Sequence, residues 1–91
     1  MSFDPSKIEE FLAHFETHKA RIRSFAGCQL LELYRDKQDA NVFFTYSLWN
    51  SEQDLEHYRQ SELFQDVWSY TKPMFNAKPE AWSVDKVVSM M

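Results

Sequence analysis

Aromatic side chains, rather than charged ones, are the best candidates for chemistry in this sequence. Trp49 stands where an apolar, strand-like run ends and a capped helical segment begins. A tryptophan at such a junction can form a cavity wall against which a flat ring stacks, or it can simply plug the end of a sheet. Tyr58 can donate a hydrogen bond to a ligand oxygen, or it can cover the edge of the core with its hydroxyl in water. Trp68 suits either the core or the wall of the same cavity.

Three further reactive side chains are placed less favourably for chemistry. His14 and His18 have a spacing that can chelate a metal on a helix, but they flank the apolar stripe and face solvent without an obvious third ligand. We therefore expect an ordinary helix flank and no metal. Cys28 has no basic neighbour in the sequence, so a buried, inert thiol is expected. The common hydrolase, nucleotide-binding and zinc-binding motifs are also missing from the sequence.

A predicted order of helix, strand, strand, helix, helix and strand must position these side chains. Asp4 and Pro5 are typical of a helix start, and apolar residues then recur at helical spacing as far as Phe25. Gly27 is the single glycine of the chain and suits a left-handed turn after this helix. Alternating patterns predict strands at 28–35, 41–49 and 81–88, with a polar loop at 36–40.

Two helices are predicted between the second and the third strand. Ser51, with Asp54 three residues later, is typical of a helix start, and this short helix should reach about Gln60. Ser61 offers a second cap, and the residues after it trace one apolar helical face. Pro73 predicts that the second helix kinks or ends just before it.

The strand at 41–49 carries large apolar groups on both of its faces. One face holds Val42, Phe44, Tyr46 and Leu48, and the other holds Phe43, Thr45, Ser47 and Trp49. Helices can cover only one face of such a sheet, so the other face needs a partner subunit, and we expect a symmetric homodimer. The order of elements predicts an α+β, ferredoxin-like fold with an antiparallel sheet, whose first strand is missing or reduced to residues 1–3.

Length and composition indicate a single domain, residues 1–91, with more aromatic side chains than one small core can bury. Eight Phe, four Tyr and three Trp overfill one thin core, so some of them should line a pocket or an interface. The net charge of −4 is not clustered, so we expect no nucleic-acid partner. No apolar run is long enough to span a membrane, and the lone Cys28 fits a reducing cytoplasm.

Five short motifs, spread over nearly the whole chain, are distinctive. They are Phe-Phe-Thr-Tyr-Ser-Leu-Trp at 43–49, Ser-Glu-Gln-Asp-Leu-Glu-His-Tyr at 51–58, Ser-Glu-Leu-Phe at 61–64, Gly-Cys at 27–28 and Lys-Pro-Glu-Ala-Trp at 78–82. Together they resemble the antibiotic biosynthesis monooxygenase domain. The resemblance implies a dimeric α/β barrel, in which two ferredoxin-like sheets pack face to face and each subunit encloses a small apolar cavity. Such proteins include cofactor-independent monooxygenases of quinols and anthrones, haem-degrading enzymes and members without assigned activity.

The chain departs from the pattern of this family at several positions. Many members have a histidine at the position of Tyr58 and another at that of Leu63. His57 is one residue earlier and points about 100° away on a helix, so it does not replace the first of them. Haem-degrading members carry an iron-ligating histidine where this chain has Trp68, which cannot ligate iron. The chain also begins too late for a full first strand, which is either short or encoded upstream.

The resemblance implies a cofactor-independent monooxygenase that acts on a small aromatic substrate, of the quinol or anthrone type, without metal or flavin. The residues implied to shape its cavity are Phe44 (or Phe43), Tyr46, Trp49, Tyr58, Phe64 and Trp68. Tyr58 is the candidate catalytic residue, and the sequence leaves open which strand face lines the cavity and whether turnover occurs. The alternative is a non-catalytic dimer that binds a small hydrophobic molecule or has a stress-associated role. Haem degradation ranks third because of Trp68.

Overall fold

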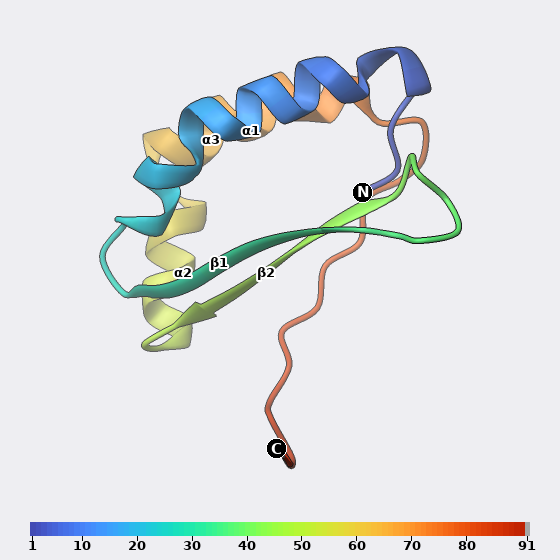
Figure 1. Cartoon of the computed structure of the whole chain (residues 1–91). Coiled ribbons are helices and arrows are strands. Elements are labelled where there is room, and N and C mark those ends of the chain that lie inside the picture. The colour runs from blue at the N-terminus through green and yellow to red at the C-terminus, as the bar shows by residue number, and fades with distance from the viewer. Residues whose placement is uncertain (91) are drawn as a thin grey trace.

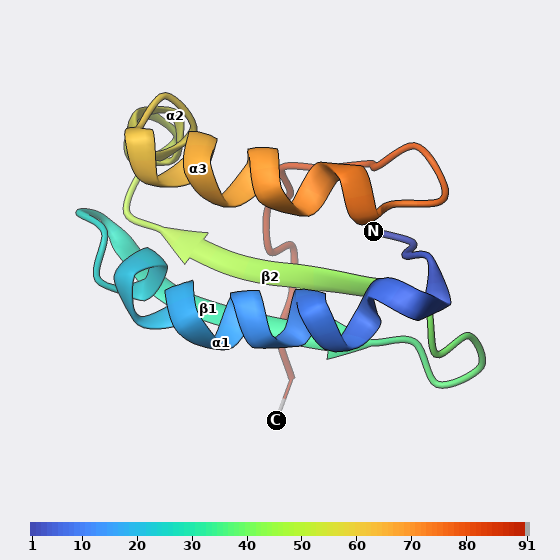
Figure 2. The ribbon, with the colours of Figure 1, turned by 90° about the horizontal axis from the view of Figure 1, so that it is seen from above.

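The computed structural model describes residues 1–90 and shows an α+β chain of helices packed on one small sheet (Figure 1). Its elements are the 3-10 turn η1 (Pro5–Lys7), α1 (Ile8–Arg23), β1 (Cys28–Arg35), β2 (Phe43–Trp49), α2 (Glu52–Arg59), α3 (Glu62–Thr71) and the 3-10 turn η2 (Lys72–Met74). Helices α1 and α3 lie side by side over one face of the sheet, and α2 stands across the end of α3 (Figures 1 and 2). We call the face under these helices the inner face and the opposite one the outer face.

The helix boundaries follow from local hydrogen bonds that the sequence predicts. The Asp4 carboxylate accepts from the Ser6 backbone N–H at 2.9 Å and begins η1, which leads directly into α1. The Ser51 hydroxyl accepts from the Asp54 N–H at 3.1 Å, and the Ser61 hydroxyl accepts from the Phe64 N–H, also at 3.1 Å. These bonds satisfy N–H groups that have no partner inside their helices. The predicted caps of all three helical segments are thereby confirmed.

Gly27 makes the turn from α1 to β1 and cannot be replaced without strain. Its φ of +90° lies in the left-handed region, where a side chain is disfavoured. A Cβ atom at this position would lie 2.5 Å from the Asp54 Cβ of α2. The Gly27 carbonyl also accepts a 2.8 Å hydrogen bond from the Asn50 N–H, so the turn joins the start of β1 to the end of β2. The predicted role of the glycine is confirmed.

Strands β1 and β2 form an antiparallel ladder whose register decides which residues share a face. Leu31 pairs with Ser47 and Leu33 with Thr45 on the inner face. The outer face carries three further pairs: Leu30 with Leu48, Glu32 with Tyr46, and Tyr34 with Phe44. Strand β2 begins two residues later than predicted, because Val42 takes part only in an isolated bridge to Ser2.

The N-terminal residues are the short first strand that the sequence analysis allowed. The backbone N–H of Phe3 donates to the Asn41 carbonyl at 2.9 Å, and that of Phe43 donates to the Met1 carbonyl at 2.8 Å. On its other side, Phe3 forms an isolated bridge with Phe75, just after η2. These few contacts bring the start of the chain between β2 and the segment that follows α3.

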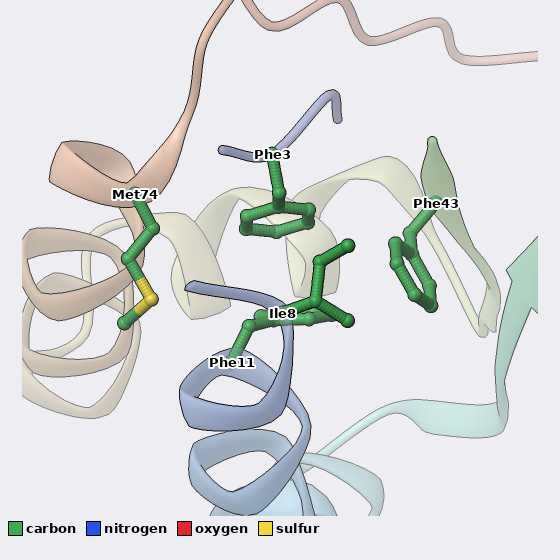
Figure 3. Close-up of a cluster of buried hydrophobic side chains, with 5 residues drawn as sticks. All are labelled: Phe3, Ile8, Phe11, Phe43 and Met74. Carbon is green, nitrogen blue, oxygen red and sulfur yellow. The ribbon is translucent and has the colours of Figure 1, made fainter. Parts of the chain in front are cut away.

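A cluster of aromatic rings at one end of the inner face forms the main core (Figure 3). Its buried members are Phe3, Ile8, Phe11, Phe43 and Met74. Phe3 is fully buried, and its ring stacks on that of Phe11 with the centroids 4.2 Å apart. Burying one such side chain contributes about 1.5–3 kcal/mol, so Phe3 secures the short N-terminal segment against the helices.

The predicted strand at 81–88 is not formed, which corrects the sequence interpretation. After η2 the chain leads to the outer-face side of the sheet without regular structure, and Trp82 and Val87 are 75% and 94% exposed (Figure 1). In a ferredoxin-like sheet the last strand pairs with the first. Here the segment in that place forms bridges only at Ser2 and Phe3, so the edge on which the last strand would pair is two residues long.

Candidate functional site

A cavity of about 150 Å³ lies between the inner face of the sheet and the three α-helices. Strand β2 contributes Trp49, α2 contributes Tyr58, and α3 contributes Phe64 and Trp68. The remaining apolar lining comes mainly from α1 and β1, with Phe11, Phe15, Ile22 and Leu31. An apolar hollow with few polar groups is the usual form of a small-molecule site.

Local structure explains why four rings from three elements meet in this cavity. Trp49 points inward because it lies an even number of residues from the buried Phe43 on the same strand. The Ser51 cap then starts α2 almost at once, which directs Tyr58 toward Trp49 two turns later. Phe64 and Trp68 lie four residues apart and therefore share one face of α3.

The four rings form two stacked pairs that meet at a steep angle. Trp49 and Tyr58 stack with centroids 5.0 Å apart and planes inclined by 26°. Phe64 and Trp68 are almost parallel, at 9° and 6.0 Å. Between the pairs, the Tyr58 and Phe64 rings meet edge to face at 74° and 5.2 Å. Such offset and edge contacts are favourable for aromatic rings and hold the walls in place.

Among residues 1–90, Tyr58 carries the one ionisable side chain in the lining of the cavity, which also includes Met1 with its N-terminal amino group. Burial, with a second contribution from the nearby Cys28 thiol, raises the pKa of the Tyr58 hydroxyl to about 12. The phenolate is disfavoured because the apolar surroundings cannot solvate its charge. At neutral pH Tyr58 is therefore a protonated hydrogen-bond donor and not a base.

The other polar side-chain groups of the cavity are neutral hydroxyls and indole N–H groups. The Trp49 indole N–H donates to the Ser47 hydroxyl at 3.0 Å, which fixes the orientation of the indole ring. The Thr71 hydroxyl donates to the Val67 carbonyl at 2.8 Å within α3. Among the described residues, no carboxylate, imidazole or charged side chain lines the cavity. The arrangement can bind and orient a neutral aromatic molecule.

Four of the six residues predicted for the cavity lie together, and two do not. Trp49, Tyr58, Phe64 and Trp68 all line it. Phe44 and Tyr46 lie on the outer face and are 52% and 37% exposed. They point away because side chains alternate along β2, and the inward positions belong to residues of the same parity as Trp49. Whether the four inward residues bind a substrate stays a prediction.

Sequence reasoning did not name the sheet residues that form the floor of the cavity. Thr45 and Ser47 line it from β2, and Leu31 lines it from β1. The signal was available for the first two, because they share the parity of Trp49 within the same strand. The inward position of Leu31 depends on the register between the strands, which the sequence alone does not specify.

The histidine pair lies outside this cavity, in an open hollow between α1 and α3. The ring of His14 packs between His18, at 4.3 Å between centroids, and Tyr70, at 4.2 Å. Burial is the main cause that lowers the pKa of His14, with His18 as a second cause. Residues 1–90 contain no group of three or more His, Cys, Asp or Glu side chains suited to a metal ion.

Cys28 is 5% exposed, so the prediction that its thiol is buried is confirmed. In the part of the chain that the structure describes, no helix has the length and apolar character required to cross a membrane.

Comparison with known proteins identifies the family. Residues 1–68 match the family model described as antibiotic biosynthesis monooxygenase, or ABM. The chain belongs to the ABM family. The resemblance drawn from the five sequence motifs is therefore confirmed, although the family itself does not specify a substrate.

Individual relatives support the ABM fold and differ widely in sequence. The Synechocystis protein sll1783 is 29% identical over 83 residues, which are 91% of this chain but 56% of that protein, so the chain spans little more than half of its length. A conserved protein from Methanosarcina mazei Go1 matches with a TM-score of 0.82 at 16% identity, covering 87% of this chain and 78% of that one. A structure from Caulobacter crescentus CB15 that bears the ABM name matches with a TM-score of 0.79 at 23% identity, covering 86% and 74%. These structures confirm the ferredoxin-like α+β fold.

Proposed function

We propose that this ABM protein binds a small aromatic molecule in its inner-face cavity and promotes the oxidation of that molecule by O₂ without a metal or organic cofactor. The observation that carries the proposal is the cavity of about 150 Å³ walled by Trp49, Tyr58, Phe64 and Trp68. Membership of the ABM family supports the type of chemistry. The aromatic walls favour a flat ring, and the low polarity favours a substrate with few polar atoms.

In the proposed reaction the substrate supplies the electrons and the protein positions it. In a phenol or quinol, the hydroxyl loses a proton to solvent, and an electron-rich ring carbon of the resulting phenolate reduces O₂. One oxygen atom becomes a carbonyl at that ring carbon and the other leaves as water, so for phenol C₆H₆O + O₂ gives the quinone C₆H₄O₂ + H₂O. Tyr58, held protonated by burial, donates a hydrogen bond to the substrate oxygen on which negative charge accumulates. The apolar walls limit the access of water to the reacting carbon.

A second candidate function is binding without turnover, and one observation favours it. Among the described residues, no side chain that lines the cavity is a general base, and the environment that raises the pKa of Tyr58 to about 12 also disfavours an anionic substrate. A carrier or stress-associated binding protein needs only the apolar walls. Haem degradation is disfavoured, because Trp68 stands at the position where haem-degrading members of the family carry the iron-ligating histidine.

We further propose that the working protein is a homodimer joined through the outer face of the sheet. Four large apolar side chains lie together on that face, and each is between 37% and 52% exposed: Tyr34, Phe44, Tyr46 and Leu48. The apolar tail after η2 also lies on this side (Figure 1). A partner subunit would cover both the face and the tail, and the buried single cysteine fits a reducing cytoplasm.

Oxygen uptake with a panel of quinols and anthrones tests the catalytic proposal. Tyr58→Phe removes the donor and should lower the rate by about tenfold, in line with the loss of about one hydrogen bond to developing charge. Tyr46→Phe is the matched control, because it removes the same hydroxyl from the outer face. Uptake that continues unchanged in Tyr58→Phe would remove Tyr58 from the mechanism. No uptake by the wild type across the panel, together with ligand binding, would favour the binding-only function.

A further inference from the structure

The size of the inner-face cavity restricts the class of molecule that it can hold. Its volume is about 150 Å³. An apolar cavity of about 150 Å³ is large enough for a benzene-sized molecule. A tricyclic anthrone needs much more room, and a close-packed protein interior accommodates extra volume only by straining its side chains and backbone.

The walls add a restriction of shape. The Trp49–Tyr58 pair and the Phe64–Trp68 pair form two flat surfaces, and the rings of Tyr58 and Phe64 meet at 74°. Each pair is already stacked within itself, so a ligand does not intercalate within either pair. A single flat ring can stack on one surface while presenting its edge to the other, which are the two preferred aromatic geometries. A second fused ring would run into the adjoining wall.

The polarity of the lining restricts the functional group on that ring. Its polar side-chain groups are the hydroxyls of Thr45, Ser47, Tyr58 and Thr71 and the indole N–H groups of Trp49 and Trp68. Ser47 accepts from the Trp49 indole and keeps its own proton to donate. No charged side chain lines the cavity within residues 1–90, and the N-terminal amino group of Met1 already donates to the Phe43 carbonyl at 2.8 Å, so a carboxylate would be desolvated there without a charged side chain to pair with. A neutral hydroxyl can instead exchange hydrogen bonds with Tyr58.

We propose that the cavity is specific for a monocyclic phenol, one aromatic ring with a neutral hydroxyl directed to Tyr58, and that it excludes bicyclic and tricyclic rings as well as aromatic carboxylates. This inference deepens the proposed function and rests on it only for the location of the site. It narrows the quinol-or-anthrone class to its smallest members.

Ligand binding, measured without turnover, tests this specificity. The probes are phenol, 1-naphthol, anthrone and benzoate, titrated under anaerobic conditions against the intrinsic tryptophan fluorescence and checked by ligand-observed NMR. We expect phenol to bind, and the Kd of 1-naphthol and that of benzoate to be at least about tenfold higher. No binding of anthrone is expected. Anthrone binding as tightly as phenol, or no binding of phenol, would overturn the proposal.

Variants that enlarge the cavity provide a second test. Phe64→Ala should shift the preference toward 1-naphthol by about tenfold relative to phenol, because a benzene-sized volume is removed from one wall. If its circular dichroism shows loss of fold, Val67→Ala enlarges the same cavity more gently and should shift the preference in the same direction. Phe44→Leu on the outer face is the control and should leave the preference unchanged. A preference that is equal in all three variants would contradict the proposal.

The outcomes separate this inference from the catalytic proposal. If phenol binds but no phenol or quinol supports oxygen uptake, the ring-size specificity stands and the catalytic proposal fails. If anthrone supports uptake and phenol does not bind, the oxidase proposal stands and the ring-size specificity fails.

Discussion

The two faces of the β1–β2 sheet have similar numbers of aromatic side chains and opposite surroundings. On the inner face, Trp49 stacks on Tyr58 of α2, and the two rings enclose a cavity together with rings from α3. On the outer face, Tyr34 and Phe44 stack on each other at 5.2 Å and remain 42% and 52% exposed. The difference shows that helix cover, rather than aromatic content, decides whether a ring in this fold forms a pocket wall or stays exposed.

The polar groups of the two faces differ in the same way. The inner face offers neutral hydroxyls, whereas the outer face carries Glu32, which accepts a 2.8 Å hydrogen bond from the Tyr34 hydroxyl. A charged carboxylate is tolerated on the outer face because solvent reaches it. The inner face thus suits a neutral small molecule, and the outer face suits a protein surface with an apolar centre and polar groups among its rings.

The largest expected difference between the faces is in the free energy of unfolding. Substitutions of two adjacent phenylalanines, one on each face, test it. Phe43→Ala on the inner face removes a ring that is 2% exposed and should lower the free energy of unfolding by about 3–5 kcal/mol. Phe44→Ala should cost much less in the monomer. Urea unfolding at several protein concentrations separates the two: the cost of Phe43→Ala should persist on dilution, whereas that of Phe44→Ala should fade as dimers dissociate. Equal, concentration-independent losses would mean that the faces do not differ in this way.

The next largest effect concerns association through the outer face. Leu48→Asp places a charge among the rings of the proposed interface and should raise the dimer Kd at least a hundredfold, which corresponds to about 2.7 kcal/mol. Thr17→Asp, on the exposed side of α1, is the control with the same charge change. Sedimentation velocity over a range of concentrations gives the Kd of each variant. A wild-type chain that sediments as a folded monomer at micromolar concentration would contradict the proposed dimer.

The same contrast explains how much the sequence could predict. Features set by neighbouring residues were predicted correctly: the caps at Ser51 and Ser61, the left-handed turn at Gly27 and the end of α3 before Pro73. Each depends on the chemistry of a few consecutive residues.

Features that depend on contacts between distant parts of the chain could not be predicted from local sequence patterns. The strand expected at 81–88 has a suitable alternation but lacks a paired edge, and pairing depends on the short N-terminal segment. Phe44 and Tyr46 were assigned to the cavity with Trp49, although strand alternation puts them on the other face. A pattern of period two identifies two faces, but it does not say which one the helices cover.

The smallest expected effect is a change in tyrosine pKa. One tyrosine on each face has a raised pKa, and the physical cause differs between the two. Burial raises the pKa of Tyr58 to about 12, whereas the first cause of the raised pKa of Tyr34 is its hydrogen bond to Glu32. Tyrosinate absorbance, followed with pH as wild type minus Tyr58→Phe, should therefore give a midpoint near 12. Glu32→Gln should lower the pKa of Tyr34 and leave that of Tyr58 unchanged.

The pH dependence of stability has a sign that follows from the same cause. An unfolded chain loses the Tyr58 proton near the ordinary tyrosine pKa, about 10, while the folded chain keeps it to about 12. Between these values the unfolded state binds fewer protons, so the free energy of unfolding falls as pH rises and levels off above the folded pKa. Tyr58→Phe should flatten this decline, and Tyr46→Phe serves as the outer-face comparison. If Glu32→Gln alone flattened it, the outer face and not the cavity would govern alkaline stability.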